Sequence, residues 1–170
     1  AQKVSASVRE RYAGEAIFIR AYLYSYLVNC FGDVPRVTNT IDVGDDELYG
    51  SSTDKETMIE WILDEFDRAA AVLPYAKDLK DSELGRPTKE AAWAFSSRFA
   101  LYHERWDKAV SSAEEVMTAG FHKLYDNGNP ETTYNELFTL AANPVTNKNN
   151  REFIVTRLYS EEANQTHNFS

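Results

Sequence analysis

The sequence is poor in cysteine, glycine and proline: its 170 residues include one Cys, seven Gly and five Pro. A single cysteine excludes a disulfide framework and a cysteine-rich zinc module. The low glycine and proline content excludes collagen-like repeats, and an apolar content of 43% excludes general disorder. No apolar run reaches the roughly 18 residues that a membrane-spanning helix needs. The length fits one domain around one hydrophobic core.

The sequence also has few basic residues relative to acidic ones: 18 Lys and Arg against 27 Asp and Glu, which gives a net charge of −9. A surface of this sign repels a phosphate backbone, so we expect no nucleic-acid partner. The chain opens at Ala1 without a basic, signal-type segment. We interpret it as a mature chain or as a piece of a longer one.

Apolar residues recur at a helical period in four stretches of the chain, and the last two are separated by only a few residues. The predicted helices cover about residues 8–31, 53–73, 88–103 and 107–119. The first is apolar on nearly all sides, which predicts a buried helix with Cys30 inside it. Thr53 and Glu56 have the spacing of a capping box at the start of the second. The short connection between the last two predicts an αα-hairpin of the tetratricopeptide type.

The chain changes character after Gly120. Residues 127–150 contain seven Asn, which favour turns, so we expect residues 120–150 to be mostly ordered loop, with a short helical patch around residues 134–140. Residues from about 153 to 159 are apolar and β-branched enough to predict a strand. The predicted fold is therefore mainly α, with tetratricopeptide-like helix pairs, irregular loops and one short strand.

Motifs that carry chemistry are scarce in this sequence. It has no G-x-S-x-G element, no phosphate-binding loop and no metal-binding spacing among its three histidines. Its paired carboxylates are neighbours in sequence and point to different helix faces, which makes them poor acid–base pairs. We therefore predict no catalytic residue, no metal site and no cofactor, so an enzyme is the minority interpretation.

Five blocks of the sequence resemble, in order, the signature of the SusD/RagB family. The first block has three parts, residues 14–24 (GEAIFIRAYLY), 27–28 (LV) and 31–35 (FGDVP). The others are residues 62–69 (ILDEFDRA), 85–92 (GRPTKEAA), 106–109 (WDKA) and 150–155 (NREFIV). Phe153 and Val155 depart mildly from the usual pattern. Because the five blocks follow the family's order and are distributed along residues 14–155, they form a specific signal together, although no single block would.

The resemblance implies a lipoprotein that is anchored to the bacterial outer membrane, exposed at the cell surface, and bound to lipid through a cysteine upstream of Ala1. It implies a binding protein for glycan that acts as a lid on a SusC-like TonB-dependent transporter, with no catalytic role. A peptide-capturing lid of the RagB type and a protein-binding helical scaffold remain as alternatives. Because family members are considerably longer, we expect this chain to be an incomplete, single segment of one.

A sugar site needs an exposed aromatic ring for the apolar sugar face and amide or charged groups for the hydroxyls. The three tryptophans lie on predicted helices, and we expect them to pack there. Arg20, the one charge in the middle of the first helix, is expected to pair with an acidic neighbour and to stabilise the fold. The candidate ligand residues are therefore those in the loops: Tyr49, Tyr125, Tyr134, Asn143 and Asn147.

Overall fold

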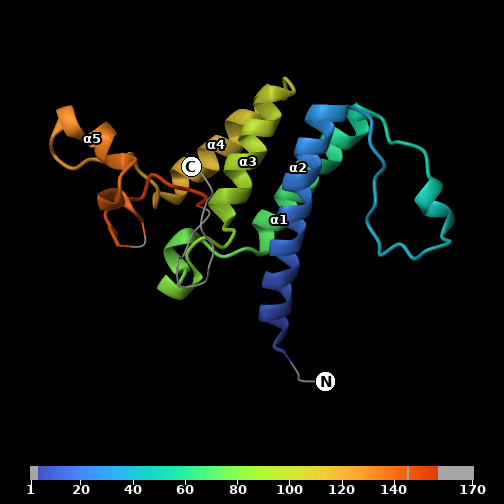
Figure 1. Ribbon diagram of the computed structural model, residues 1–170, viewed down its shortest axis with the longest axis horizontal. Helices are drawn as coiled ribbons and strands as arrows, with labels where there is room; N and C mark the ends of the chain where they lie inside the picture. The colour runs from blue at the N-terminus through green and yellow to red at the C-terminus, as the bar shows by residue number, and fades with distance from the viewer. Residues whose placement is uncertain (1–3, 145, 157–170) are drawn as a thin grey trace, which may run out of the picture.

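The computed structural model describes residues 4–144 and 146–156, and helices dominate them (Figure 1). The α-helices are α1 (Ala6–Phe31), α2 (Lys55–Val72), α3 (Lys89–Tyr102), α4 (Trp106–Ala119) and α5 (Pro130–Leu137). Four 3-10 turns join them: η1 (Asp46–Tyr49), η2 (Ala76–Asp78), η3 (Asp81–Glu83) and η4 (Leu140–Ala142). The first four α-helices begin and end within two residues of their predicted ranges.

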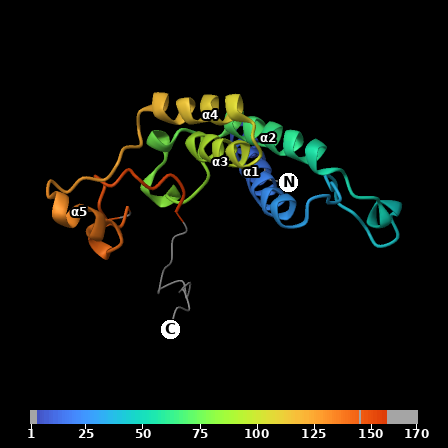
Figure 2. The ribbon, with the colours of Figure 1, turned by 90° about the horizontal axis from the view of Figure 1, so that it is seen from above.

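The long helices pack in chain order, α1 against α2, α2 against α3, and α3 against α4. The α3–α4 pair is the predicted αα-hairpin, and Gly120 ends it in the left-handed conformation, with φ 68° and ψ 7°. Figure 2 shows the four helices side by side, with α5 beyond one end of the group and the loop that carries η1 beyond the other. The predicted mainly α fold of stacked helix pairs is confirmed.

The core of this four-helix group is centred on α2. Eight of its eighteen residues are buried, and the apolar ones recur at the spacing of one helix face. Phe66 is 1% exposed and meets the ring of Phe18 from α1 edge-on, with centroids 6.0 Å apart. The small residues of α3 let its backbone approach α2 closely, and Ala91, Ala92 and Ala100 are all fully buried.

The prediction that α1 is buried on nearly all sides is wrong. Its buried face consists of Gly14, Phe18, Ala21, Ser25 and Val28, whereas the apolar stripe on its other side is exposed: Val8, Tyr12, Ile19, Leu23 and Tyr26. The reason is that α1 packs mainly against one neighbour, α2, which covers one face only. None of the described helices, α1 included, is long and apolar enough to cross a membrane.

Two smaller predictions on α1 and α2 are also wrong. Cys30 is exposed, because it lies two residues after buried Val28 and therefore on the opposite side of the helix. The N-cap of α2 is Asp54, whose carboxylate accepts a hydrogen bond from the Thr57 amide at 2.9 Å. Thr53 instead exchanges backbone hydrogen bonds with Val34, at 2.9 and 3.2 Å.

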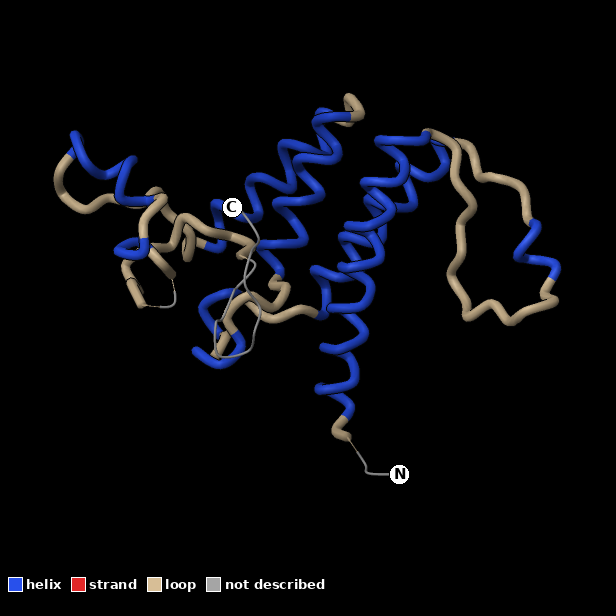
Figure 3. Tube along the Cα trace, in the orientation of Figure 1, coloured by secondary structure: helices blue, strands red, loops and turns tan. Residues whose placement is uncertain are grey.

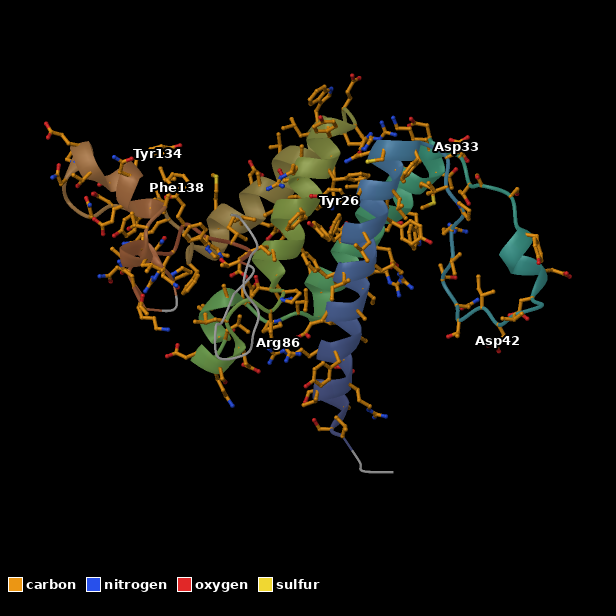
Figure 4. All side chains as sticks on the ribbon, in the orientation of Figure 1. Tyr26, Asp33, Asp42, Arg86, Tyr134 and Phe138 are labelled. Atoms are coloured by element: carbon orange, nitrogen blue, oxygen red, sulfur yellow. The ribbon has the colours of Figure 1, made fainter. Side chains whose placement is uncertain are left out.

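Ion pairs between charged residues of the sequence blocks connect the helices. Arg20 of α1 donates through Nε to Glu65 of α2 at 2.8 Å, and Glu65 is fully buried. Arg86 makes a two-pronged contact with Glu15, at 2.9 and 2.5 Å, beside the N-terminal half of α1 (Figure 4). Glu15 and Arg20 belong to one block, Glu65 to the second and Arg86 to the third, so these residues have structural roles in the helix group.

The predicted strand at about 153–159 is wrong over its described part. Phe153–Thr156 contain no strand, and residues 157–159 lie outside the described residues (Figure 3). A strand needs a partner for its backbone groups, and the nearest pairing is a single hydrogen bond from Lys123 N to Arg151 O at 3.3 Å. Ile154 packs instead against the helical core.

Candidate functional site

The five predicted ligand residues lie at two ends of the molecule. Tyr49 ends η1 and is 86% exposed, in the loop beyond the α1–α2 end of the helix group (Figure 1). The other four lie at the opposite end, in what we call the α5 segment, the described residues from 124 to 152. The structure therefore brings Tyr125, Tyr134, Asn143 and Asn147 into one region and leaves Tyr49 apart.

Tyr125 is an internal support of the α5 segment. Its side chain is 7% exposed, and its hydroxyl donates to Glu136 Oε1 at 2.6 Å. Asn147 Nδ2 donates to the same hydroxyl at 3.3 Å and to Ala141 O at 3.0 Å. The hydrogen bond to Glu136 raises the pKa of Tyr125 and, from the other side, lowers that of Glu136, which also accepts from Asn127.

Asn143 lies in the turn that follows η4 and is half-buried. Its carbonyl accepts from Asn147 N at 2.7 Å and from Thr146 N at 3.1 Å. This is the turn role that Asn favours. Asn143 and Asn147 therefore shape the loop that closes the α5 segment.

Tyr134 is the predicted residue that faces solvent in this region. It is 74% exposed on α5, and Phe138, one turn later, is 70% exposed. The two rings meet edge-on, with centroids 5.1 Å apart and planes at 70° (Figure 4). We call Tyr134 and Phe138 the aromatic pair. A helix as short as α5 presents them together because residues four apart lie on one face.

A hollow lies beside Tyr134. Its walls combine apolar and acidic side chains: Leu124, Tyr125, Asp126, Pro130, Thr133, Tyr134, Leu137 and Glu152. Asp126 Oδ1 accepts from Gly128 N at 2.7 Å, and Glu152 Oε2 accepts from Tyr125 N at 2.7 Å. An aromatic ring next to carboxylate and hydroxyl oxygens is the combination that a sugar needs, a flat apolar surface with hydrogen-bond acceptors at its side.

Phe138 was not among the predicted ligand residues, although its spacing of four from Tyr134, within the helical patch predicted at about 134–140, indicates a pair on one helix face. The expectation that every tryptophan packs is wrong for Trp106, which is 58% exposed at the start of α4. Trp61 and Trp93 do pack against the core. Among the described residues there is no group of three or more His, Cys, Asp or Glu that could hold a metal ion.

Comparison with known proteins agrees with the arrangement of helices. A model of SusD-like proteins, described as starch-binding and associating with the outer membrane, matches residues 1–101. The SusD-like protein P25 of Formosa agariphila is 26% identical over 125 residues, which make up 71% of this chain and 23% of that protein.

Two solved structures from Bacteroides fragilis are similar over almost the whole chain. A SusD-like carbohydrate-binding protein is 30% identical with a TM-score of 0.79, covering 94% of this chain and 29% of its own. A further SusD-like protein is 29% identical with a TM-score of 0.79, covering 93% of this chain and 29% of its own. This chain thus spans less than a third of the length of each of these relatives. The shared sequence blocks, the helix order and these matches together show that the chain belongs to the SusD-like family.

Proposed function

We propose that the protein of which this chain is part binds oligosaccharide without catalysis, and that the aromatic pair Tyr134–Phe138 is one of its contact surfaces. The observation that carries the proposal is the pair itself, two rings each at least 70% exposed, of which Tyr134 also lines a hollow that contains two carboxylate residues. Stacking of an aromatic ring on a sugar face and hydrogen bonds to its hydroxyls would provide the affinity.

The relatives support a glycan as the ligand. One of the similar Bacteroides fragilis proteins is a carbohydrate-binding protein, and the matching family model is described as starch-binding. Because this chain spans 29% of that protein, we expect residues outside it to complete the binding surface. Tyr49, at the far end of the molecule, is proposed as a separate, minor contact.

Delivery to a transporter is the second part of the proposal. The family resemblance supports an outer-membrane lipoprotein at the cell surface that passes its ligand to a SusC-like TonB-dependent transporter. Capture at the surface needs only a non-covalent site with a moderate residence time, since the ligand must leave again for the transporter. A co-purification of the full-length protein with such a transporter from outer membranes tests this part.

Binding is tested on the full-length protein, with starch, laminarin and xylan oligosaccharides and a peptide library as probes in calorimetry. We expect saturable binding of one glycan class, with a loss of about tenfold or more in affinity for Tyr134→Ala. The matched control is Tyr102→Ala, because Tyr102 is 77% exposed on α3, in the helix group. Equal loss in both variants, or none in Tyr134→Ala, would reject the aromatic pair. Binding of peptides alone would indicate the RagB-type alternative.

A further inference from the structure

α5 is held in place without apolar burial. None of its eight residues is buried, and it packs mainly against the short turn η4. A helix of two turns is not stable by itself in water, so its position has to come from specific contacts with the rest of the chain. The orientation of the aromatic pair depends on those contacts, because Tyr134 projects from this helix and Phe138 is its C-cap residue.

The strongest of these contacts meet at one residue of α5, Glu136. Its Oε1 accepts from the Tyr125 hydroxyl at 2.6 Å, and its Oε2 accepts from Asn127 Nδ2 at 2.5 Å. Hydrogen bonds to an ionised carboxylate are about twice as strong as those between neutral groups. Glu136 lies two residues from Tyr134 and two from Phe138, so it points about 200° away from both around the helix. The carboxylate therefore fixes the face opposite the aromatic pair.

The two donors are themselves firmly placed. Tyr125 is buried, and its backbone amide donates to Glu152 Oε2 at 2.7 Å. Asn127 Oδ1 accepts from the Thr133 hydroxyl at 2.5 Å and from Asn129 N at 2.9 Å. Asn129 in turn caps α5 by accepting from Glu131 N at 3.1 Å. A continuous set of side-chain hydrogen bonds thus connects a buried tyrosine to both turns of α5.

We infer that Glu136 is the positioning residue of the ligand site: its carboxylate, held by Tyr125 and Asn127, keeps α5 in the orientation at which the aromatic pair can bind. The inference rests on the proposed function, because it gives that site its support. Glu136 itself touches no ligand.

The kinetics of binding distinguish positioning from contact. If α5 is correctly oriented only for a fraction of the time, the association rate falls by that fraction while the dissociation rate of the bound ligand stays the same. Loss of a residue that touches the ligand raises the dissociation rate instead. Glu136→Ala is therefore expected to reduce the association rate about tenfold. Tyr134→Ala is expected to act mainly on dissociation.

The experiment uses full-length variants and the oligosaccharides of starch, laminarin and xylan as probes, with surface plasmon resonance as the readout. Glu131→Ala is the matched control, since it removes the same charge from the same helix and its carboxylate makes none of the described hydrogen bonds. Tyr125→Phe, which removes the hydroxyl that donates to Glu136 and accepts from Asn147, should reproduce part of the effect of Glu136→Ala. The double variant with Tyr134→Ala should lose less affinity than the sum of the two single losses, because Glu136 acts through the Tyr134 and Phe138 rings.

Hydrogen exchange of residues 130–142 separates this inference from the proposed function. We expect faster exchange there in Glu136→Ala than in Glu131→Ala, with a melting temperature within about 2 °C of the unmodified protein. Unchanged exchange, a global loss of stability, or independent effects of Glu136→Ala and Tyr134→Ala would overturn the inference. If exchange changes as expected but no probe binds, or Tyr134→Ala binds normally, the proposed ligand site fails while the support of α5 by Glu136 stands.

Discussion

The four-helix group and the α5 segment are stabilised by different interactions. In the group, apolar side chains of α1, α2, α3 and α4 are buried in one continuous cluster. In the α5 segment, the buried residues Tyr125, Ala142 and Asn150 lie outside that cluster, and amide and carboxylate side chains make most of the contacts.

Because the two regions are stabilised by different interactions, the stability of the helix group and ligand binding by the α5 segment should respond to different substitutions. A cluster of buried apolar residues unfolds cooperatively, whereas a segment held by exposed or half-exposed hydrogen bonds can open locally at a smaller free energy. Changes in the α5 segment should therefore alter the proposed ligand surface without unfolding the helix group.

Phe66→Ala is expected to give the greatest loss. Phe66 is 1% exposed and packs against the rings of Phe18 and Phe95, which also contact each other. Removing it leaves a cavity and should lower the free energy of unfolding by about 3–5 kcal/mol. Urea unfolding of the full-length protein measures this. Leu140→Ala, at an 85% exposed position of the α5 segment, should change the free energy by less than about 0.5 kcal/mol. Similar losses in both variants would erase the contrast between the two regions.

Arg20→Ala should destabilise the helix group by about 1.5–3 kcal/mol. It removes a charge-assisted hydrogen bond and leaves the fully buried Glu65 paired with Arg68 alone. Oligosaccharide affinity, measured by calorimetry below the melting temperature, should not change. Arg9→Ala is the control, since Arg9 is exposed on the same helix. Lost affinity at unchanged stability would move Arg20 from a structural role to a ligand role.

Asn150→Ala tests the α5 segment in the same way. Asn150 is 5% exposed, and its side chain donates to Ala142 O at 2.5 Å and accepts from Glu152 N at 3.1 Å. Its loss leaves two backbone groups without partners and should favour local opening by about 1–3 kcal/mol. Hydrogen exchange of residues 140–152 reports the opening, with the exposed Asn149→Ala as control. A fall in the global melting temperature as large as that of Phe66→Ala would show that the segment unfolds together with the helices.

Acid pH should give the smallest effect, confined to the α5 segment. The pKa of Glu136 is lowered by its hydrogen bonds from Tyr125 and Asn127. Its stabilising contribution is therefore complete above the ordinary glutamate pKa and is lost as pH falls through the lowered one. Exchange of residues 130–142, corrected for intrinsic rates, should accelerate between about pH 5 and about pH 3. Glu136→Ala should lose this acceleration, and an equal response in that variant would assign it to another group.

The two N-terminal helices show how far apolar periodicity can be trusted. In α2 the spacing of Ile59, Ile62 and Phe66 identifies the buried face correctly. In α1 apolar residues occupy two faces, and the sequence cannot say which of them a neighbour covers. The close approach of Gly14 to α2 decides it: a Cβ atom there would lie 2.5 Å from Val72 Cγ2, so this face has to be the inner one.

The candidate site, like the buried faces of α1 and α2, was predicted only in part from the sequence. The run of Asn residues indicated an irregular region with ordered turns, and Tyr134 lay within it. The helical patch predicted at about 134–140 starts four residues after the start of α5, which begins with Pro130 after the cap Asn129. The patch contained both Tyr134 and Phe138, but the sequence did not show that both rings are exposed. Tyr125 and Asn147 could not be recognised as supports, because their partners Glu136 and Ala141 are 11 and 6 residues away in the chain.

The mainly α fold, the positions of the four long helices and the family could be read from the amino-acid sequence, since each of these follows from local periodicity, helix-ending residues and short blocks of residue types. The exposed face of α1, the lack of a strand at residues 153–156 and the shared exposure of Tyr134 and Phe138 became evident only in the three-dimensional structure. The physical reason is that burial, strand pairing and the orientation of α5 depend on contacts between residues far apart in the chain. A local sequence pattern does not specify which distant residue will make such a contact.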